Sequence, residues 1–207
     1  MGTNVRSAAV DISLALDDVQ RAGFPMGAES LVALDLADTL ITVTTPSTDL
    51  IGDPGRADVW WGLQAARLPS SPIPELGATR QLRAALRDLF DAHLEGRSAA
   101  PTSIDDLNAF AASVPTSPRL LGQHPARTET RWHTEHGGNP ALAAIASGAI
   151  DLFGDESRLA ELRRCANEGC SMLFLASNRR RMWCTANICG NRARVARHYE
   201  RTHRGDA

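Results

Sequence analysis

The chain has 207 residues and contains no lysine, so all 22 of its Lys and Arg residues are arginines. Because arginine serves wherever a cation is needed, its mere presence is weak support for phosphate recognition, whereas its distribution along the chain is informative. Apolar runs long enough to span a membrane are also missing. Charges interrupt residues 1–25 throughout, which excludes an apolar targeting segment there. We therefore predict a cytoplasmic protein with no membrane association.

Cysteine is absent from the first 164 residues and then occurs four times within 25 residues, at Cys165, Cys170, Cys184 and Cys189. The four residues form two C-x4-C pairs separated by thirteen residues. Two short turns that each offer two thiolates suit the tetrahedral coordination of zinc. We predict one structural Zn²⁺ per chain on these four ligands, with an iron–sulfur cluster or disulfides as the alternatives.

The net charge of −2 conceals a strong asymmetry. Residues 1–157 carry 11 Arg against 20 Asp and Glu, a net charge of −9, whereas residues 158–207 carry 11 Arg against 4 acids, a net charge of +7. An acidic body with a basic tail predicts an anionic partner at the C-terminal end.

Apolar periodicity in the acidic part predicts a mainly α (α+β) fold, with helices at 29–43, 57–68, 78–96, 103–114 and 140–153 and a loose β-hairpin at 119–136. We expect Ser103 to cap the fourth helix and Asn139–Pro140 to begin the fifth. On the third helix, Arg83, Arg87 and Asp91 are interpreted as a solvent-facing surface.

The cysteine-bearing part predicts a treble-clef-like arrangement. We expect a short strand at 159–165, a knuckle at 165–170, a β-hairpin at 171–184 and a second knuckle at 184–192 that opens the final helix. Zinc-thiolate sites contribute folding energy directly, so chelation is expected to unfold this tail while residues 27–154 stay folded.

The final helix carries a basic stripe. Arg194, Arg197, Arg201 and Arg204 follow one another at spacings of 3, 4 and 3, so they share one side of the helix. Val195, Tyr199 and Thr202 lie on the other side and are the expected packing face. Together with Arg179, Arg180 and Arg181, expected in the turn of the hairpin, the stripe is typical of nucleic-acid binding. The alternative is a basic helix that docks on an acidic protein, including the chain's own N-terminal part.

The motif WC-x4-CGNR, followed by a basic helix, closely resembles the CGNR zinc finger. In that family the finger follows a helical ABATE domain, and LVALDLADTL and DLIGDPGRADVWWGL resemble the opening stretch and Trp-bearing helix of that domain. We therefore divide the chain into an N-terminal extension (1–26), an ABATE-like helical domain (27–157) and a CGNR finger with its basic helix (158–207).

The resemblance implies a DNA-binding transcription regulator of the stress response. We expect Gly190, Asn191 and Arg192 to form the second knuckle, with Asn191 and Arg192 holding it through hydrogen bonds. A homodimer and an unknown small-molecule ligand of the helical domain are further expectations. The finger departs from the family pattern in its hairpin, which offers Ala176 and Asn178, and Asp38–Thr39 replaces the family's N-T pair.

An enzyme is not expected. His124, His133 and His136 lie close together in sequence, but no nucleophile or orienting group accompanies them. The following Gly137–Gly138 indicates a turn, so we interpret these histidines as surface or hairpin residues.

Overall fold

The computed structural model describes residues 14–203, and over this range the chain is mainly helical with three two-stranded antiparallel ribbons. Its elements, in order, are α1 (Leu16–Arg21), α2 (Val32–Ala37), β1 (Leu40–Ile41), β2 (Thr48–Asp49), α3 (Pro54–Gln64), η1 (Ala65–Arg67), α4 (Leu76–Glu95), α5 (Pro101–Ala112), β3 (Thr116–Gln123), β4 (Ala126–Trp132), η2 (Thr134–His136), α6 (Pro140–Phe153), α7 (Glu156–Leu159), β5 (Leu162–Arg164), β6 (Leu173–Leu175) and α8 (Cys189–His203).

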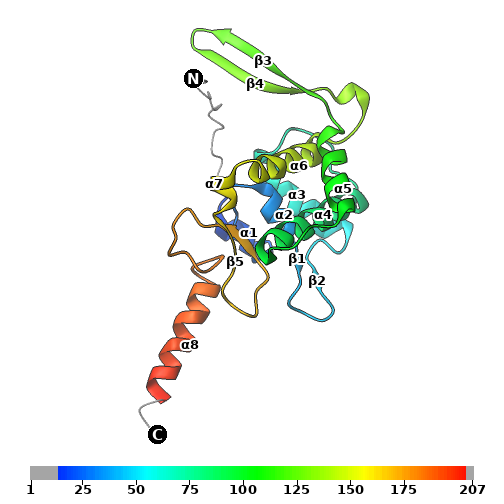
Figure 1. Cartoon of the computed structure of the whole chain (residues 1–207). Coiled ribbons are helices and arrows are strands. Elements are labelled where there is room, and N and C mark those ends of the chain that lie inside the picture. Colours follow the sequence, from blue (N-terminus) through cyan, green and yellow to red (C-terminus); the bar gives the residue numbers. More distant parts are fainter. Residues whose placement is uncertain (1–13, 204–207) are drawn as a thin grey trace.

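Helices α2 to α6 pack into one body, from which two elements project (Figure 1). The β3–β4 hairpin leaves the body at one end, and α8 leaves it at the other. Across residues 14–203, none of the helices combines the length and the apolarity that a membrane span requires.

The predicted helices at 78–96 and 140–153 are confirmed as α4 and α6. On α4, Leu82, Leu86 and Phe90 are fully buried, and the helix ends at Gly96, whose left-handed φ of 65° suits glycine. On α6, the Asn139 side chain accepts hydrogen bonds from two backbone N–H groups, and Pro140 occupies the first turn.

The prediction of one helix over 29–43 is wrong in extent. Helix α2 ends at Ala37, and Leu40–Ile41 forms β1, which pairs with β2. Residues 39–44 are Thr-Leu-Ile-Thr-Val-Thr, and β-branched side chains lose rotamer freedom in a helix but fit a strand.

Two predicted helix starts are corrected. Helix α3 begins at Pro54, three residues early, because Asp53 caps it by accepting from the Arg56 N–H at 3.0 Å. Helix α5 begins at Pro101, so Ser103 lies buried inside the first turn and does not cap it. The Asp88 carboxylate instead accepts from the Ala100 N–H at 2.8 Å.

The solvent-facing interpretation of Arg83 and Arg87 is also wrong, because each residue is only 5% exposed. The Arg83 guanidinium pairs with both carboxylate oxygens of Asp49 at 2.5 and 2.9 Å. Arg87 donates to Asp91 at 2.8 Å. Helix α4 therefore has a buried charged side as well as a buried apolar one.

The predicted hairpin at 119–136 is confirmed as β3–β4, with Arg119 opposite Glu129 and an irregularity in register between Leu120 and Gly122. Its strands are exposed along most of their length.

The region assigned to an N-terminal extension contributes to the core, because Val19, Phe24 and Met26 are buried.

The predicted hairpin within 171–184 is wrong. Strand β6 pairs with β5 across the first knuckle, with Leu162 opposite Leu175 and Arg164 opposite Leu173. Residues 176–188 form no strand, although Met182 accepts a hydrogen bond from the Ala166 N–H at 2.9 Å. Leu173 and Phe174 are fully buried in the same apolar core as α2, α4 and α6.

Candidate metal centre and nucleic-acid interface

The four cysteines converge from four places in the chain: Cys165 directly after β5, Cys170 shortly before β6, Cys184 within the long loop 176–188, and Cys189 at the start of α8. Their sulfur atoms all lie within 4.8 Å of one another, and Cys170 Sγ is 3.8 Å from Cys184 Sγ. A regular tetrahedron with zinc–sulfur bonds of about 2.3 Å has sulfur–sulfur edges of about 3.8 Å. All four thiols are free, so the disulfide alternative does not hold in this structure.

Local backbone geometry places the first pair of ligands. The Cys165 N–H donates to the Met172 carbonyl at 2.9 Å, which closes the β5–β6 ribbon at the knuckle. Inside the knuckle, the Asn167 side chain accepts a hydrogen bond from the Gly169 N–H at 3.0 Å. The backbone carbonyl of Asn167 accepts one from the Cys170 N–H at 2.8 Å. The tight turn predicted from Asn167 and Gly169 is therefore present.

The second pair of ligands is placed by the start of α8. Cys189 is the first residue of that helix, as predicted, and the Gly190 N–H donates to the Thr185 carbonyl at 2.9 Å. A Cβ at Gly190 would lie 3.4 Å from both this carbonyl oxygen and the Trp183 ring, so the first turn of α8 packs against the knuckle at van der Waals distance.

The thiols lie close enough together to shift the pKa of Cys170, Cys184 and Cys189. Cys170 accepts a hydrogen bond from Cys184, which lowers the pKa of Cys170 to about 5 and raises that of Cys184. Burial, followed by repulsion from the neighbouring sulfurs, raises the pKa of Cys189 to about 11. Four thiolates at this spacing repel one another unless a cation compensates them, which fits one Zn²⁺ held by Cys165, Cys170, Cys184 and Cys189.

The residues predicted to brace the second knuckle are placed differently. Within residues 14–203, the exposed side chains of Asn191 and Arg192 make no hydrogen bond to the knuckle. Arg194 fills this position instead, because its guanidinium donates to the Gly190 carbonyl at 3.3 Å and to the Ala186 carbonyl at 3.2 Å. The Asn167 amide also lies 3.7 Å from Cys189 Sγ.

The predicted basic stripe lies on the projecting helix α8 (Figure 1). Arg194, Arg197 and Arg201 are exposed, whereas Arg204 lies outside the described residues. None of the three pairs with a carboxylate whose side chain the structure describes. The expectation that Val195 and Tyr199 form a packing face is wrong, because they are 61% and 62% exposed.

The three arginines of the loop 176–188 differ in their exposure to solvent. Arg179 and Arg180 are exposed, and the Asn178 side chain accepts from the Arg180 N–H at 2.9 Å. Arg181 turns inward, where its guanidinium stacks 4.3 Å from the Phe174 ring centroid and pairs with Glu29 at 2.5 Å. The geometry therefore gives Arg181 a structural position, away from the exposed basic surface.

Sequence reasoning missed two acidic residues at this centre, Glu29 and Asp38, which are 6% and 1% exposed. Both approach the finger from the helical domain, and Asp38 accepts from the Leu173 N–H with both carboxylate oxygens at 3.0 Å. For Asp38 the available signal was the pair of acids, Asp35 and Asp38, in the otherwise mostly apolar run LVALDLADTL, because a buried charge needs a partner. Glu29 lies before this run and carried no such signal.

The histidines stay apart from the metal centre. His124 is exposed at the tip of the β3–β4 hairpin, and His136 is exposed in η2. His133 lies 2.9 Å from Ser117 Oγ and 3.0 Å from Glu135 Oε1, which are contacts within the hairpin base.

Comparison with known proteins finds two family models that match the chain. The ABATE model, described as "putative stress-induced transcription regulator", matches residues 31–156, and the CGNR zinc finger model matches residues 161–202. No curated protein gives a significant match. The finger match agrees with the single-zinc centre formed by the four cysteines. The chain belongs to the ABATE family and carries a CGNR zinc finger at its C-terminal end.

Proposed function

We propose that the chain is a DNA-binding transcription regulator in which α8 contacts the duplex. The observation that carries this proposal is the exposure of Arg194, Arg197 and Arg201 on a helix that projects from an acidic body. A 15-residue helix is about 22 Å long, and the major groove of B-DNA, about 12 Å wide, admits one.

The zinc serves as an anchor for this helix. Cys189 fixes its first turn to the metal, while Arg194 ties the second turn to the knuckle carbonyls. Four thiolates fill a tetrahedron, so no coordination position remains for a hydrolytic water. We therefore propose a structural zinc and no catalytic activity.

The exposed loop arginines extend the same surface. Arg179 and Arg180 would meet the phosphate backbone and steady the finger, whereas Arg197 and Arg201 lie further along α8. Phosphate contacts release condensed counterions, so the logarithm of the binding constant falls by about 0.9 per contact for each unit of log salt concentration.

The test is a set of binding isotherms on duplex DNA, selected from a random pool by the zinc-loaded protein, at several salt concentrations. Replacing Arg197 and Arg201 together with alanine should weaken binding and reduce the salt slope by about 1.8, with zinc retained. The matched control removes Arg127 and Arg131, which are exposed on the β3–β4 hairpin at the other end of the molecule, and should leave the slope unchanged.

An acidic protein is the second candidate partner of α8, because the exposed Val195 and Tyr199 add apolar surface on the other side of the helix from the arginines. If the Arg197/Arg201 variant binds DNA with an unchanged salt slope, this candidate takes precedence over DNA.

A further inference from the structure

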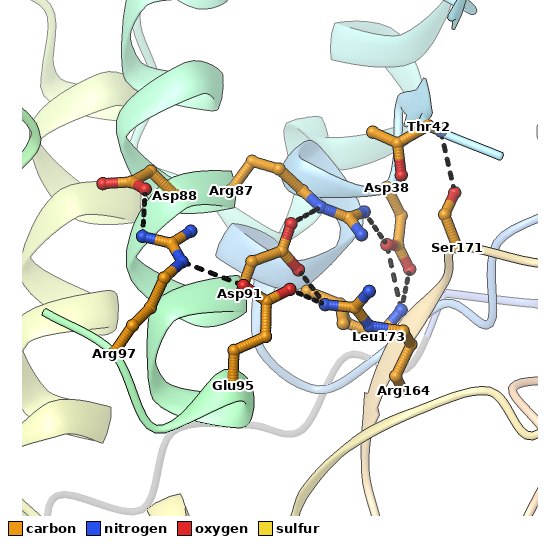
Figure 2. Close-up of polar contacts among 10 residues, drawn as sticks. All are labelled: Asp38, Thr42, Arg87, Asp88, Asp91, Glu95, Arg97, Arg164, Ser171 and Leu173. Atoms are coloured by element: carbon orange, nitrogen blue, oxygen red, sulfur yellow. Dashed lines mark hydrogen bonds and ion pairs between the residues drawn. The ribbon is translucent and has the colours of Figure 1, made fainter. Parts of the chain in front are cut away.

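The finger packs on the helical domain through polar contacts, and those of Asp38 with Leu173 are buried. The division of the sequence into a helical domain and a finger does not predict these contacts. Figure 2 shows these contacts around Asp38 of the α2–β1 turn, Arg87 and Asp91 of α4, and Leu173 of β6. Arg164 of β5 donates to Asp91 at 2.8 Å and to Glu95 at 3.1 Å. Nearby, the Thr42 N–H donates to Ser171 Oγ at 3.1 Å.

Asp38 supports the part of the metal centre that contains Cys165 and Cys170. Its carboxylate accepts from the Leu173 N–H, and the residue before Leu173 accepts from the Cys165 N–H. The contact therefore fixes the strand that positions Cys165. The Arg87 guanidinium lies 3.7 Å from the same carboxylate and supplies the opposite charge.

Glu29 supports the part of the metal centre that contains Cys184. Its carboxylate accepts from the Leu175 N–H at 3.2 Å and from Arg181 at 2.5 Å. In turn, Arg181 donates to the carbonyls of Trp183 at 3.2 Å and Cys184 at 2.6 Å. The Glu29 carboxylate of the helical domain thus connects strand β6, through Arg181, to the zinc ligand Cys184.

The surroundings keep Glu29 in this position. The Glu29 N–H donates to Asp35 at 2.9 Å, and Asp35 pairs with Arg67 at 2.7 Å. Gly27 allows the close approach, because a Cβ there would lie 2.9 Å from the Glu29 carboxylate and 3.0 Å from the Cys184 carbonyl oxygen. A side chain at this position would push the loop away from the finger.

We propose that Glu29 and Asp38 are positioning residues for the zinc centre, so that the helical domain and the four cysteines bind metal and fold as one cooperative unit. The two acids lie outside the finger sequence, 155 and 127 residues before Cys184 and Cys165 respectively. Chelation should then disturb the helical domain as well, which replaces the expectation that residues 27–154 stay folded on their own. This proposal concerns metal binding and is independent of the partner of α8.

The first experiment measures the zinc affinity of the full-length chain by competition with a chromogenic chelator. The substitutions Glu29→Gln and Asp38→Asn each remove one charge at nearly constant volume. Removing groups that orient metal ligands weakens metal binding by about 10–100-fold, and we expect about tenfold for each variant.

Three controls separate positioning from a general loss of stability. Glu129→Gln and Asp58→Asn make the same chemical changes at exposed positions and should leave zinc affinity within about twofold, because surface carboxylates couple weakly to a distant site. Leu107→Ala removes a buried side chain of α5 and sets the scale for a general loss of stability. In one cooperative unit it should lower zinc affinity only as far as it lowers the free energy of unfolding, whereas Glu29→Gln and Asp38→Asn should lower zinc affinity further for the same loss of stability. Folded Glu29 and Asp38 variants with wild-type zinc affinity would overturn the proposal.

The second experiment uses the wild-type chain and covers the case in which a variant does not fold. Amide hydrogen exchange is measured with zinc bound and after chelation. Loss of protection in α2 and α4 together with the finger is expected if they form one cooperative unit. Unchanged protection of α2 and α4 after the zinc is removed would overturn the proposal.

Discussion

Helices α4 and α8 carry the same arginine pattern with opposite consequences. Arg80, Arg83 and Arg87 on α4 and Arg194, Arg197 and Arg201 on α8 both follow spacings of 3 and 4. In α4, the second and third arginines are buried against carboxylates, whereas in α8 they are exposed on a projecting helix. In a chain without lysine, every cationic side chain of this kind is an arginine. An arginine that pairs with a buried carboxylate stabilises the fold, whereas an exposed one with no carboxylate partner is available to bind a ligand.

The largest contrast is expected at the third arginine of each helix. Arg87→Met should lower the free energy of unfolding by about 3–5 kcal/mol, because it leaves Asp38 and Asp91 without their buried cation. Arg201→Met should change it by less than about 0.5 kcal/mol, since its side chain is exposed. Denaturant unfolding of the zinc-loaded proteins measures both. Equal losses at the two positions would remove the contrast.

A smaller contrast is expected at the second arginine. Arg83→Lys should cost about 2 kcal/mol, because lysine cannot reproduce the two-pronged contact with Asp49 and the accompanying bond to Thr39. Arg197→Lys should leave stability unchanged and keep most of the DNA affinity, because lysine also neutralises a phosphate. Unfolding curves and binding isotherms of the two variants test this. A stability loss in Arg197→Lys would mean that α8 is packed in solution.

At the first arginine the two helices should behave alike, with the smallest effects. Arg80 donates to the Gly52 carbonyl at 2.6 Å and, on a part-exposed side chain, to the Asp49 carboxylate at 3.0 Å, and Arg194 donates to the Gly190 and Ala186 carbonyls. Both side chains tie a helix to a neighbouring loop near the surface, so alanine at either position should cost about 1 kcal/mol or less. Thermal unfolding of both variants provides the measurement. A large loss at Arg194 alone would indicate that the second knuckle depends on it.

Local patterns predicted much of the fold and the metal ligands. Helices α4 and α6 follow from apolar periodicity with Gly96 and Asn139 as end signals, and both are present. The errors fall where distant segments decide the outcome. Strand β6 pairs with β5 because Leu162 and Leu175 enter a core shared with α2 and α4, and a hairpin within 171–184 offers no such burial.

The amino-acid sequence by itself determined the zinc ligands, because thiolate type and spacing within 25 residues specify a tetrahedral site through short-range geometry. It also determined that the cationic charge is concentrated at the C-terminal end. Only the tertiary structure decided which arginines are buried, that Arg181 faces Glu29, and that Asp38 supports strand β6. The contacts of Glu29 with Arg181 and of Asp38 with Leu173 join residues more than 100 positions apart. The burial that makes an unpaired charge there costly exists only once the helical domain and finger are packed together.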